Sequence, residues 1–290
     1  MTYTTLNAYL QQRFGCKVYK IALDGGFTCP NRDGTLGTRG CIFCSKGGSG
    51  DFAQSRELSI TQQLEQGKAL VARKNSSVKY IAYFQAFTNT YAPVEVLREK
   101  YSEAVRHPDV VALSVATRPD CLPDEVLQLL DEINQIKPVF VELGLQTVHA
   151  KTAAYIRRGY DLAVYDEAVD ALHRIGINVV THLILGLPGE TAEDMVASVR
   201  YVCRKTDGIK LQLLHILEGT DLADAYRAGQ IKVLSLAEYT AILRQCVAVI
   251  PPHVVIHRLT GDGAKRDLLA PLWSADKKKV INTINKALRE

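Results

Sequence analysis

The sequence lacks a long apolar run. No stretch of its 290 residues reaches the roughly 18 to 20 consecutive apolar residues that a bilayer span requires. The N-terminus, MTYTTLNAYLQQRFG, also lacks the basic head and apolar segment of a secretion signal. We therefore expect a cytoplasmic protein with no membrane partner. The chain contains no low-complexity segment and no linker rich in Pro, Ser or Gly, so we expect its C-terminal part to pack against the rest.

Cysteine is too scarce and too unevenly placed for a disulfide framework. The chain has 7 cysteines, an odd number, and at 290 residues it can bury a hydrophobic core without covalent cross-links. Histidine is absent before His107. Metal or redox chemistry therefore explains the cysteines better than disulfide bonds do.

Positive charge is concentrated at both ends of the chain. The net charge is +4, but residues 1–56 hold seven Lys and Arg against three Asp, and residues 264–290 again hold seven basic against three acidic residues. The middle of the chain is therefore acidic. Basic ends can bind a polyanion, because Lys and Arg make most phosphate contacts. They can equally be solvated helix faces, and charge alone leaves both possibilities open.

Extended apolar segments alternate with segments of helical period, which is typical of βα units that form a parallel sheet. The predicted strands are largely apolar, as expected for strands buried on both faces. They are Val18–Leu23, Lys79–Phe84, Val110–Ala116, Val139–Leu145, Asn178–Leu185 and Ile209–Ile216. Helices are predicted to begin near Ser59, Pro93, Pro123, Asp161 and Thr191, and again at Ser235 and near the C-terminus.

These elements predict an α/β fold, namely a partial (βα)6 TIM-like barrel with a C-terminal helical extension. The barrel would span residues 1–220 and would include a long loop at 24–52. The extension would span residues 221–290 and pack on the barrel.

The most informative stretch, GGFTCPNRDGTLGTRGCIFCSKGGSGDF, directly follows the first predicted strand. Its cysteines, Cys29, Cys41 and Cys44, are spaced C-x11-C-x2-C in a loop rich in Gly, Asn, Asp and Thr. In a βα barrel such a loop lies at the C-terminal face, where active sites are built. A C-x2-C pair is also half of many zinc sites, but no fourth ligand lies nearby in the sequence. Three thiolates fit a four-iron cluster better, with the fourth iron open to a small molecule.

Together with this loop, five later motifs resemble the strand-end motifs of the radical S-adenosylmethionine (SAM) superfamily. In order, they are ATRPDCLP (116–123), VELGLQT (141–147), IRRGYD (156–161), HLILGLPGET (182–191) and LQLLHILEGTDL (211–222). The chain is similar to the catalytic subunit of the elongator complex and, more closely, to the short YhcC/YtqA group, including the C-terminal APLWS. The resemblance implies a [4Fe–4S] cluster on Cys29, Cys41 and Cys44 that cleaves SAM reductively to a 5′-deoxyadenosyl radical.

The resemblance also implies which residues contact SAM. Phe43, just before the last cysteine, would flank the adenine. The segment that holds Gln85, Ala86 and Thr88 would meet the methionine amino group, although it lacks the usual pair of glycines. The remaining implied contacts are Gln146 at the end of the fourth strand, Arg158 to the SAM carboxylate, His182 to the nucleoside and Gly186 with its backbone near the adenine.

Each of these side chains also has a purely structural interpretation. Gln146 could cap a strand, Arg158 could form a surface ion pair and His182 could be a core histidine. Glu142 is either an acid inside the barrel or a substrate contact. Glu142 and His215 are the candidate catalytic residues, and beyond the cluster and SAM no catalytic group is assigned.

The elongator resemblance implies chemistry on the wobble uridine of tRNA. The chain is too short to hold the acetyltransferase domain of the elongator subunit. Resemblance to the YtqA-like group implies instead the conversion of 5-carboxymethylaminomethyluridine to 5-aminomethyluridine, the MnmL activity. The partners would be tRNA as substrate and a flavodoxin or ferredoxin as electron donor. The alternatives are a radical SAM enzyme with a small-molecule or protein substrate, and a non-catalytic iron–sulfur or zinc scaffold.

Overall fold

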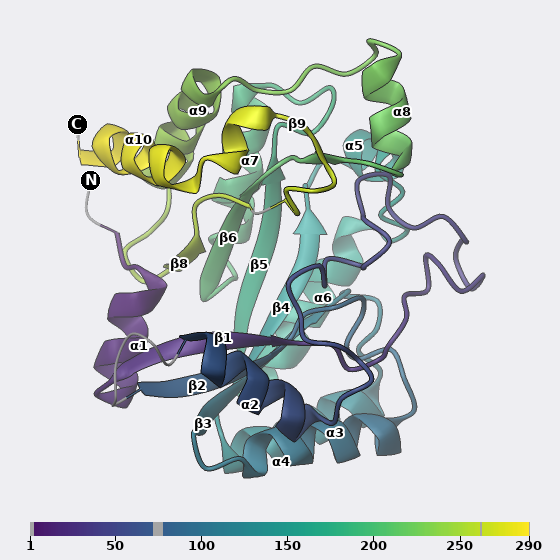
Figure 1. The fold of residues 1–290 in the computed structure, drawn as a ribbon, viewed down its shortest axis with the longest axis vertical. Coiled ribbons are helices and arrows are strands. Elements are labelled where there is room, and N and C mark those ends of the chain that lie inside the picture. The colour runs from purple at the N-terminus through teal and green to yellow at the C-terminus, as the bar shows by residue number, and fades with distance from the viewer. Residues whose placement is uncertain (1–2, 72–77, 262, 290) are drawn as a thin grey trace.

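A curved sheet of seven parallel strands forms the centre of the molecule (Figure 1). The computed structural model describes residues 3–71, 78–261 and 263–289. Neighbouring strands follow the order β1-β2-β3-β4-β5-β6-β8. Their bounds are β1 Lys17–Leu23, β2 Val78–Phe84, β3 Val110–Thr117, β4 Val139–Gln146, β5 Asn178–Leu185, β6 Gly208–Leu213 and β8 Val255–Arg258.

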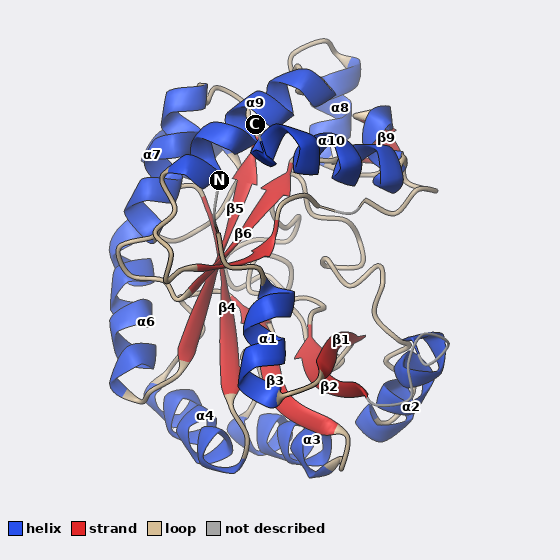
Figure 2. Cartoon of the chain, turned by 90° about the vertical axis from the view of Figure 1, so that its left-hand side faces the viewer, coloured by secondary structure: helices blue, strands red, loops and turns tan. Residues whose placement is uncertain are grey.

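Helices cover the outer face of this sheet. Figure 2 shows α3, α4, α6 and α7 as an arc outside the strands. The helices between the strands are α2 Ile60–Val71, α3 Val94–Arg106, α4 Asp124–Ile136, α5 Ala150–Tyr155, α6 Leu162–Arg174 and α7 Ala192–Val202. Their apolar residues recur at helical spacing and join one core with the outward-facing strand residues. The prediction of a partial TIM-like barrel is confirmed.

Local capping signals set several helix starts. In α7 the Thr191 hydroxyl accepts from the Asp194 N–H, and the Asp194 carboxylate accepts from the Thr191 N–H, which is the predicted capping box. Pro93 and Pro123 lie one residue before α3 and α4, because each ends the preceding loop in an extended conformation. The short helices α1 (Leu6–Phe14), α5 and α8 (Asp221–Arg227) were not predicted.

The sheet differs from the prediction at its C-terminal edge. A seventh strand, β8, pairs in parallel with β6 and contains only four residues, too few to show a period. The sixth predicted strand, Ile209–Ile216, is also wrong at its end. β6 stops at Leu213, and β7 (Ile216–Leu217) pairs instead with β9 (Leu268–Ala270) in a separate antiparallel ribbon.

Helix α1 (Leu6–Phe14) lies across the N-terminal end of the barrel, between the edge strands β1 and β8. Ile256 N–H donates to the Thr4 carbonyl at 2.8 Å, which ties the start of the chain to β8. Leu10 is buried against the first inward-facing residues of the strands, among them Ile81, Phe140 and Val180. This apolar layer closes the floor of the barrel.

The C-terminal part adds α8 Asp221–Arg227, α9 Leu236–Ala248 and α10 Lys277–Arg289. α9 packs on α7, and α10 packs on α9 through Val280, Ile284 and Leu288. A division of the chain at residue 220 stays a prediction. No helix within the described ranges has both the length and the apolar character that crossing a bilayer demands.

Candidate active site

One cavity of about 840 Å³ extends from the 24–52 loop into the barrel. Its upper part is lined by Cys29, Cys41 and Cys44. Its lower part is lined by inward-facing strand residues. Of the residues singled out from the sequence, it also brings together Phe43, Gln85, Thr88, Glu142, Gln146, Arg158, His182 and His215. The structure therefore places the cysteines and most of the implied SAM contacts around one space.

The cysteine loop is irregular, and hydrogen bonds hold its shape. Cys44 N–H donates to the Cys41 carbonyl at 3.0 Å, which forms the turn of the C-x2-C pair. Arg32 donates from Nη2 to the carbonyls of Cys44 and Ser45 at 3.0 and 2.6 Å. Asn31 Nδ2 lies 3.5 Å from Cys41 Sγ. These contacts fix the cysteines without help from regular secondary structure.

Burial governs the chemistry of the thiols. It raises the pKa of Cys41 to about 11, and the neighbouring Cys44 and Cys29 add to the effect. Burial also raises the pKa of Cys44, while Arg32 opposes the rise. Buried thiols of this kind become thiolates when iron replaces their protons.

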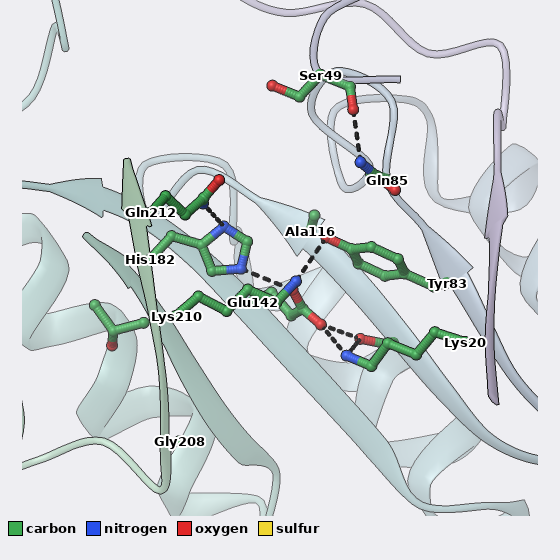
Figure 3. Close-up of polar contacts among 12 residues, drawn as sticks. Lys20, Ser49, Tyr83, Gln85, Ala116, Glu142, His182, Gly208, Lys210 and Gln212 are labelled. Carbon is green, nitrogen blue, oxygen red and sulfur yellow. Dashed lines mark hydrogen bonds and ion pairs between the residues drawn. The ribbon is translucent and has the colours of Figure 1, made fainter. Parts of the chain in front are cut away.

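The segment after β2 is joined to this loop. Gln85 Nε2 donates to the Ser49 carbonyl at 2.7 Å (Figure 3). Thr88 N–H donates to the Thr28 carbonyl at 3.1 Å. Ala86 is fully buried and lies outside the set of residues that line the cavity. A contact from Ala86 to the methionine amino group stays a prediction.

Gln146 ends β4 in an unusual conformation. Its φ is 71°, a left-handed value that favours glycine, and the pairing of β4 with β5 is irregular there. Its Oε1 is buried and accepts no hydrogen bond within the described residues. A strained residue with a free acceptor that faces a cavity suits a bound ligand with an N–H or O–H donor.

Arg158 is buried and engaged with backbone oxygens. Its Nη1 donates to the Leu145 and Thr147 carbonyls at 3.3 and 2.6 Å. Nε and Nη2 both donate to the Tyr160 carbonyl, at 3.0 and 2.9 Å. These bonds use four of the five donors of a guanidinium. Arg158 therefore braces the end of β4, and its expected contact with the SAM carboxylate stays a prediction.

His182 is held by protein groups on both sides of its ring (Figure 3). Nε2 lies 2.7 Å from Glu142 Oε2, and Nδ1 lies 3.3 Å from Gln212 Nε2. Burial lowers the pKa of His182 to about 4, so the neutral ring donates to Glu142 and accepts from Gln212. Gly186 has a φ of 91° and faces Leu234 outside the cavity. The nucleoside contacts implied for both residues stay predictions.

A polar layer crosses the barrel below these residues, and Glu142 lies at its centre (Figure 3). Oε1 of Glu142 accepts from Lys20 on β1 and, at 2.7 Å, from Ser114 on β3. Oε2 accepts from Lys210 on β6 as well as from His182. Four donors on four strands thus saturate one buried carboxylate. We name Lys20, Tyr83, Ser114, Glu142, His182, Lys210 and His257 the polar layer.

Electrostatics in the polar layer are strongly coupled. Burial would raise the pKa of Glu142, but Lys20 and Lys210 outweigh it and hold this pKa well below its ordinary value. Burial lowers the pKa of Lys210 to about 7, although Glu142 opposes the shift. Burial also holds the pKa of His257 well below its ordinary value. Glu142 is thus a carboxylate that anchors two lysines, and both histidines of the layer are neutral.

Two family models match the chain in sequence. The model of the Radical SAM superfamily matches residues 34–202, more than half of the chain. The chain belongs to the radical SAM superfamily. The model of the Radical_SAM C-terminal domain matches residues 206–290.

The radical SAM chain has relatives along its full length. It is 48% identical to the YtqA protein of Bacillus subtilis, over 99% of this chain and 89% of that protein. A tRNA uridine(34) acetyltransferase of Methanocaldococcus jannaschii is 28% identical over 57% of this chain and 30% of its own length. The structure of archaeal Methanocaldococcus infernus Elp3 with an N-terminal deletion superimposes with a TM-score of 0.64. That alignment has 17% identity and covers 90% of this chain and 63% of the Elp3 chain, and it supports the fold.

Members of the superfamily use a [4Fe–4S] cluster and SAM, and the cavity suits both. Within the ranges that the structure describes, no three His, Cys, Asp or Glu side chains converge on one point as ligands of a single metal ion would. A four-iron cluster needs no such convergence, because each thiolate binds a different iron. The unpaired Oε1 of Gln146 offers SAM an acceptor in the same cavity. Cys29, Cys41 and Cys44 would hold the cluster.

Several residues that line the cavity of this radical SAM protein were not singled out from the sequence. His215, a predicted candidate, follows β6 and lines the cavity. Lys20, Tyr83, Lys210 and His257 also line it, and none was singled out. One signal could have found the lysines. Each lies within a mostly apolar strand, KVYKIAL and GIKLQL, where a buried lysine needs a partner.

Proposed function

We propose that this radical SAM enzyme acts on the wobble uridine of tRNA and converts 5-carboxymethylaminomethyluridine to 5-aminomethyluridine. The observation that carries the proposal is the continuous cavity, which puts the cysteine loop and the polar layer in one chamber. A modified base inserted from the C-terminal face would place its side chain below the cofactors. Similarity to a tRNA uridine(34) acetyltransferase supports uridine 34 as the target.

The residues that line the cavity would have separate roles in this reaction. When bound, the cluster and SAM would supply a 5′-deoxyadenosyl radical as hydrogen-atom acceptor. Loss of one hydrogen atom and one further electron, taken up by the oxidised cluster, from the carbon between the amine and the carboxylate would give an imine. Addition of water would break the C–N bond, release the two-carbon unit as glyoxylate and leave 5-aminomethyluridine. Cys29, Cys41 and Cys44 would hold the cluster, and Gln146 would accept a hydrogen bond from SAM. Helix α1 closes the floor and keeps water from entering below. A one-electron donor such as flavodoxin or ferredoxin would reduce the cluster from outside.

The deciding experiment is a nucleoside profile of tRNA from a strain without the gene. We expect 5-carboxymethylaminomethyluridine to accumulate and 5-aminomethyluridine to disappear, and reintroduction of the gene to reverse both changes. The Cys41→Ala variant is the matched control and should not complement. An unchanged profile, together with SAM cleavage by the purified enzyme, would favour a small-molecule or protein substrate. Absence of SAM cleavage would favour the non-catalytic scaffold.

The basic C-terminal helix gives a second test of the RNA partner. Lys277 lines the cavity, and Lys277, Lys278 and Lys279 are all exposed at the start of α10. Changing the three lysines to Gln should weaken tRNA binding and flatten its dependence on salt, because fewer counterions are released. SAM cleavage without RNA should stay nearly unchanged. The measurement is tRNA affinity at several salt concentrations for both proteins. If the two proteins show the same affinity and the same salt dependence, α10 is not part of the RNA interface.

A further inference from the structure

The polar layer contains more positive than negative charge. Lys20 and Lys210 share a single carboxylate, that of Glu142, and the side chains of both lysines are largely buried. His182 and His257 are neutral, so neither histidine changes this balance. Arg258 at the end of β8 lies close enough to help lower the pKa of Lys210, and it is not counted in this balance. When both lysines are protonated, the layer carries one positive charge that no acid of the layer offsets.

Each lysine also has donor capacity left toward the cavity. An ammonium carries three N–H donors. Lys210 uses one on Glu142 and one on Tyr83 Oη, at 3.2 Å. Lys20 uses one on Glu142 and one on Ser114 Oγ, at 3.3 Å. Both residues line the cavity, so each ammonium can give its remaining N–H to a ligand.

The two ammonium groups lie close to one another. Lys20 Nζ is 4.9 Å and Lys210 Nζ is 4.6 Å from the centre of the Tyr83 ring. Both ammonium groups bond the two oxygens of one carboxylate, that of Glu142. With one surplus charge between them, they also match the two oxygens of a second, singly charged carboxylate. The apolar layer beneath, with Leu10 and Phe140, lowers the local dielectric and strengthens such a contact.

We propose that Lys20 and Lys210 form an anion subsite at the floor of the cavity, which binds the carboxylate of the substrate side chain. This inference rests on the proposed function, in which the side chain of the modified uridine ends in a carboxymethyl group. Lys20 lies three residues before the end of β1, which puts it about 10 Å below the C-terminal end of that strand at roughly 3.3 Å per residue. The carboxylate would thus be anchored at the end of the cavity away from the cluster.

The ionisation of Lys210 supports this assignment. Burial lowers its pKa to about 7, and Lys20 and Arg258 contribute to the shift, so the empty site does not hold the full charge of both lysines. A bound carboxylate would restore the proton, because an opposite charge favours the charged form. Glu142 acts here as a positioning residue that holds both ammonium groups toward the cavity.

The test compares ligands with and without the negative charge, in proteins with and without the surplus lysine. The RNA probe is an anticodon stem-loop with 5-carboxymethylaminomethyluridine or its methyl ester, bound without reductant. The second probe is N-methylglycine against its methyl ester, followed through the melting temperature of the protein. In the unaltered protein we expect the free acid of each pair to bind about tenfold tighter or more, since a hydrogen bond to a charged group is worth at least that factor.

The charge balance makes a distinctive prediction for the variants. Lys210→Met and Lys20→Met each remove the surplus, so each should reduce the preference for the free acid to about one. Adding Glu142→Gln to Lys210→Met restores one surplus charge on Lys20, and the preference should return. Lys205→Met, whose lysine pairs with Asp166 on the outside of the barrel, is the control and should keep the full preference.

The outcomes separate this inference from the proposed function. If either single variant folds and still prefers the free acid, the anion subsite is refuted, whatever RNA the enzyme modifies. The same holds if the unaltered protein shows no preference with either probe. Preference for free N-methylglycine, lost in Lys210→Met, together with no conversion of the modified tRNA, would uphold the subsite and refute the proposed substrate.

Discussion

The two ends of the cavity are built on different principles. At the cysteine end, irregular backbone carries the functional groups, and hydrogen bonds within residues 29–45 fix its shape. At the floor, regular strands carry the functional groups, and the polar layer joins side chains that are 122 residues apart in the case of Lys20 and Glu142. The upper end is thus a local feature of the sequence, whereas the lower end exists only after the whole sheet has formed.

The largest expected effect concerns the cysteine end. Replacing Cys41 with Ala should abolish the cluster, whereas anaerobic reconstitution of the unaltered protein should give about four irons and four sulfides per chain. Cys203→Ala is the matched control, because Cys203 is buried at the end of α7, and it should keep its iron. Iron and sulfide analysis measures both. Stoichiometric zinc without iron in active protein would overturn the assignment of the cysteine end.

The next effect concerns the floor. Replacing Glu142 with Ala leaves Lys20 and Lys210 buried without their shared carboxylate, and breaking a buried ion pair in this way costs about 3–5 kcal/mol of unfolding free energy. Urea unfolding measures the loss. Ser114→Ala, which removes one hydrogen bond to the same carboxylate, is the milder control. If Glu142→Ala loses no more unfolding free energy than Ser114→Ala, the polar layer is solvated. The two ends of the cavity would then not differ in the way described above.

Arg158 lies between the two ends and sharpens the comparison. Its replacement by Ala removes four hydrogen bonds to backbone carbonyls, so the melting temperature should fall. If the remaining donor meets the SAM carboxylate, SAM affinity should also fall by roughly ten- to a hundredfold, the value of a charged hydrogen bond. Arg157→Ala, which breaks an ion pair with Asp221, is the neighbouring control. If the Arg158→Ala protein is less stable but binds SAM normally, the role of Arg158 is structural and it does not contact SAM.

The last expected effect is a pH dependence of stability from Lys210. Its pKa is lowered to about 7 in the folded protein, so the unfolded chain binds more protons above that pH, and stability rises between about pH 7 and 10. Below pH 7 the full cost of the buried charge is present. Lys210→Met should flatten this rise in urea unfolding measured at several pH values. The groups that face Lys210 are Lys20, Tyr83, Glu142, His182, His257 and Arg258.

A rise of equal slope in Lys210→Met would assign the effect to another group of the layer. Tyr83 is not that group, although burial and Glu142 raise its pKa well above the ordinary value. Its contribution has the opposite sign, because stability would then be lost above pH 10. The two groups can therefore be told apart by the direction of the change.

The cysteine end could be predicted from the sequence because its signal is a short spacing in one loop. The curved parallel sheet was also predictable, since the alternation of apolar and amphipathic segments is strong from β1 to β6. β8 was missed because a strand of four residues has no readable period. Helix α1 was missed for a similar reason, as its nine residues are too few to show a clear helical period.

The floor could not be predicted as a whole. Lys20 and Lys210 stand out in apolar strands, but the meeting of both with Glu142 depends on the stagger of four strands, which loop lengths do not reveal. Arg158 illustrates another limit. A family motif indicates that an arginine is required there. It does not indicate how many N–H donors of this arginine bond backbone carbonyls, because that depends on the path of the chain after β4.

Helix α1 contacts both edge strands, β1 and β8, and this contact affects the order in which parts of the chain can fold during synthesis. Helix α1 emerges from the ribosome first, yet its neighbour β8 is encoded almost 250 residues later, and the link from Ile256 to Thr4 spans nearly the whole chain. A contact with so long a loop forms late, because chain closure is entropically costly. A nascent chain that ends before residue 255 would keep the edge of β6 exposed to other chains. It would also lack the hydrogen bond that ties the residues before α1 to β8. The strand β8, near the end of the sequence, therefore completes the sheet and secures the start of the chain.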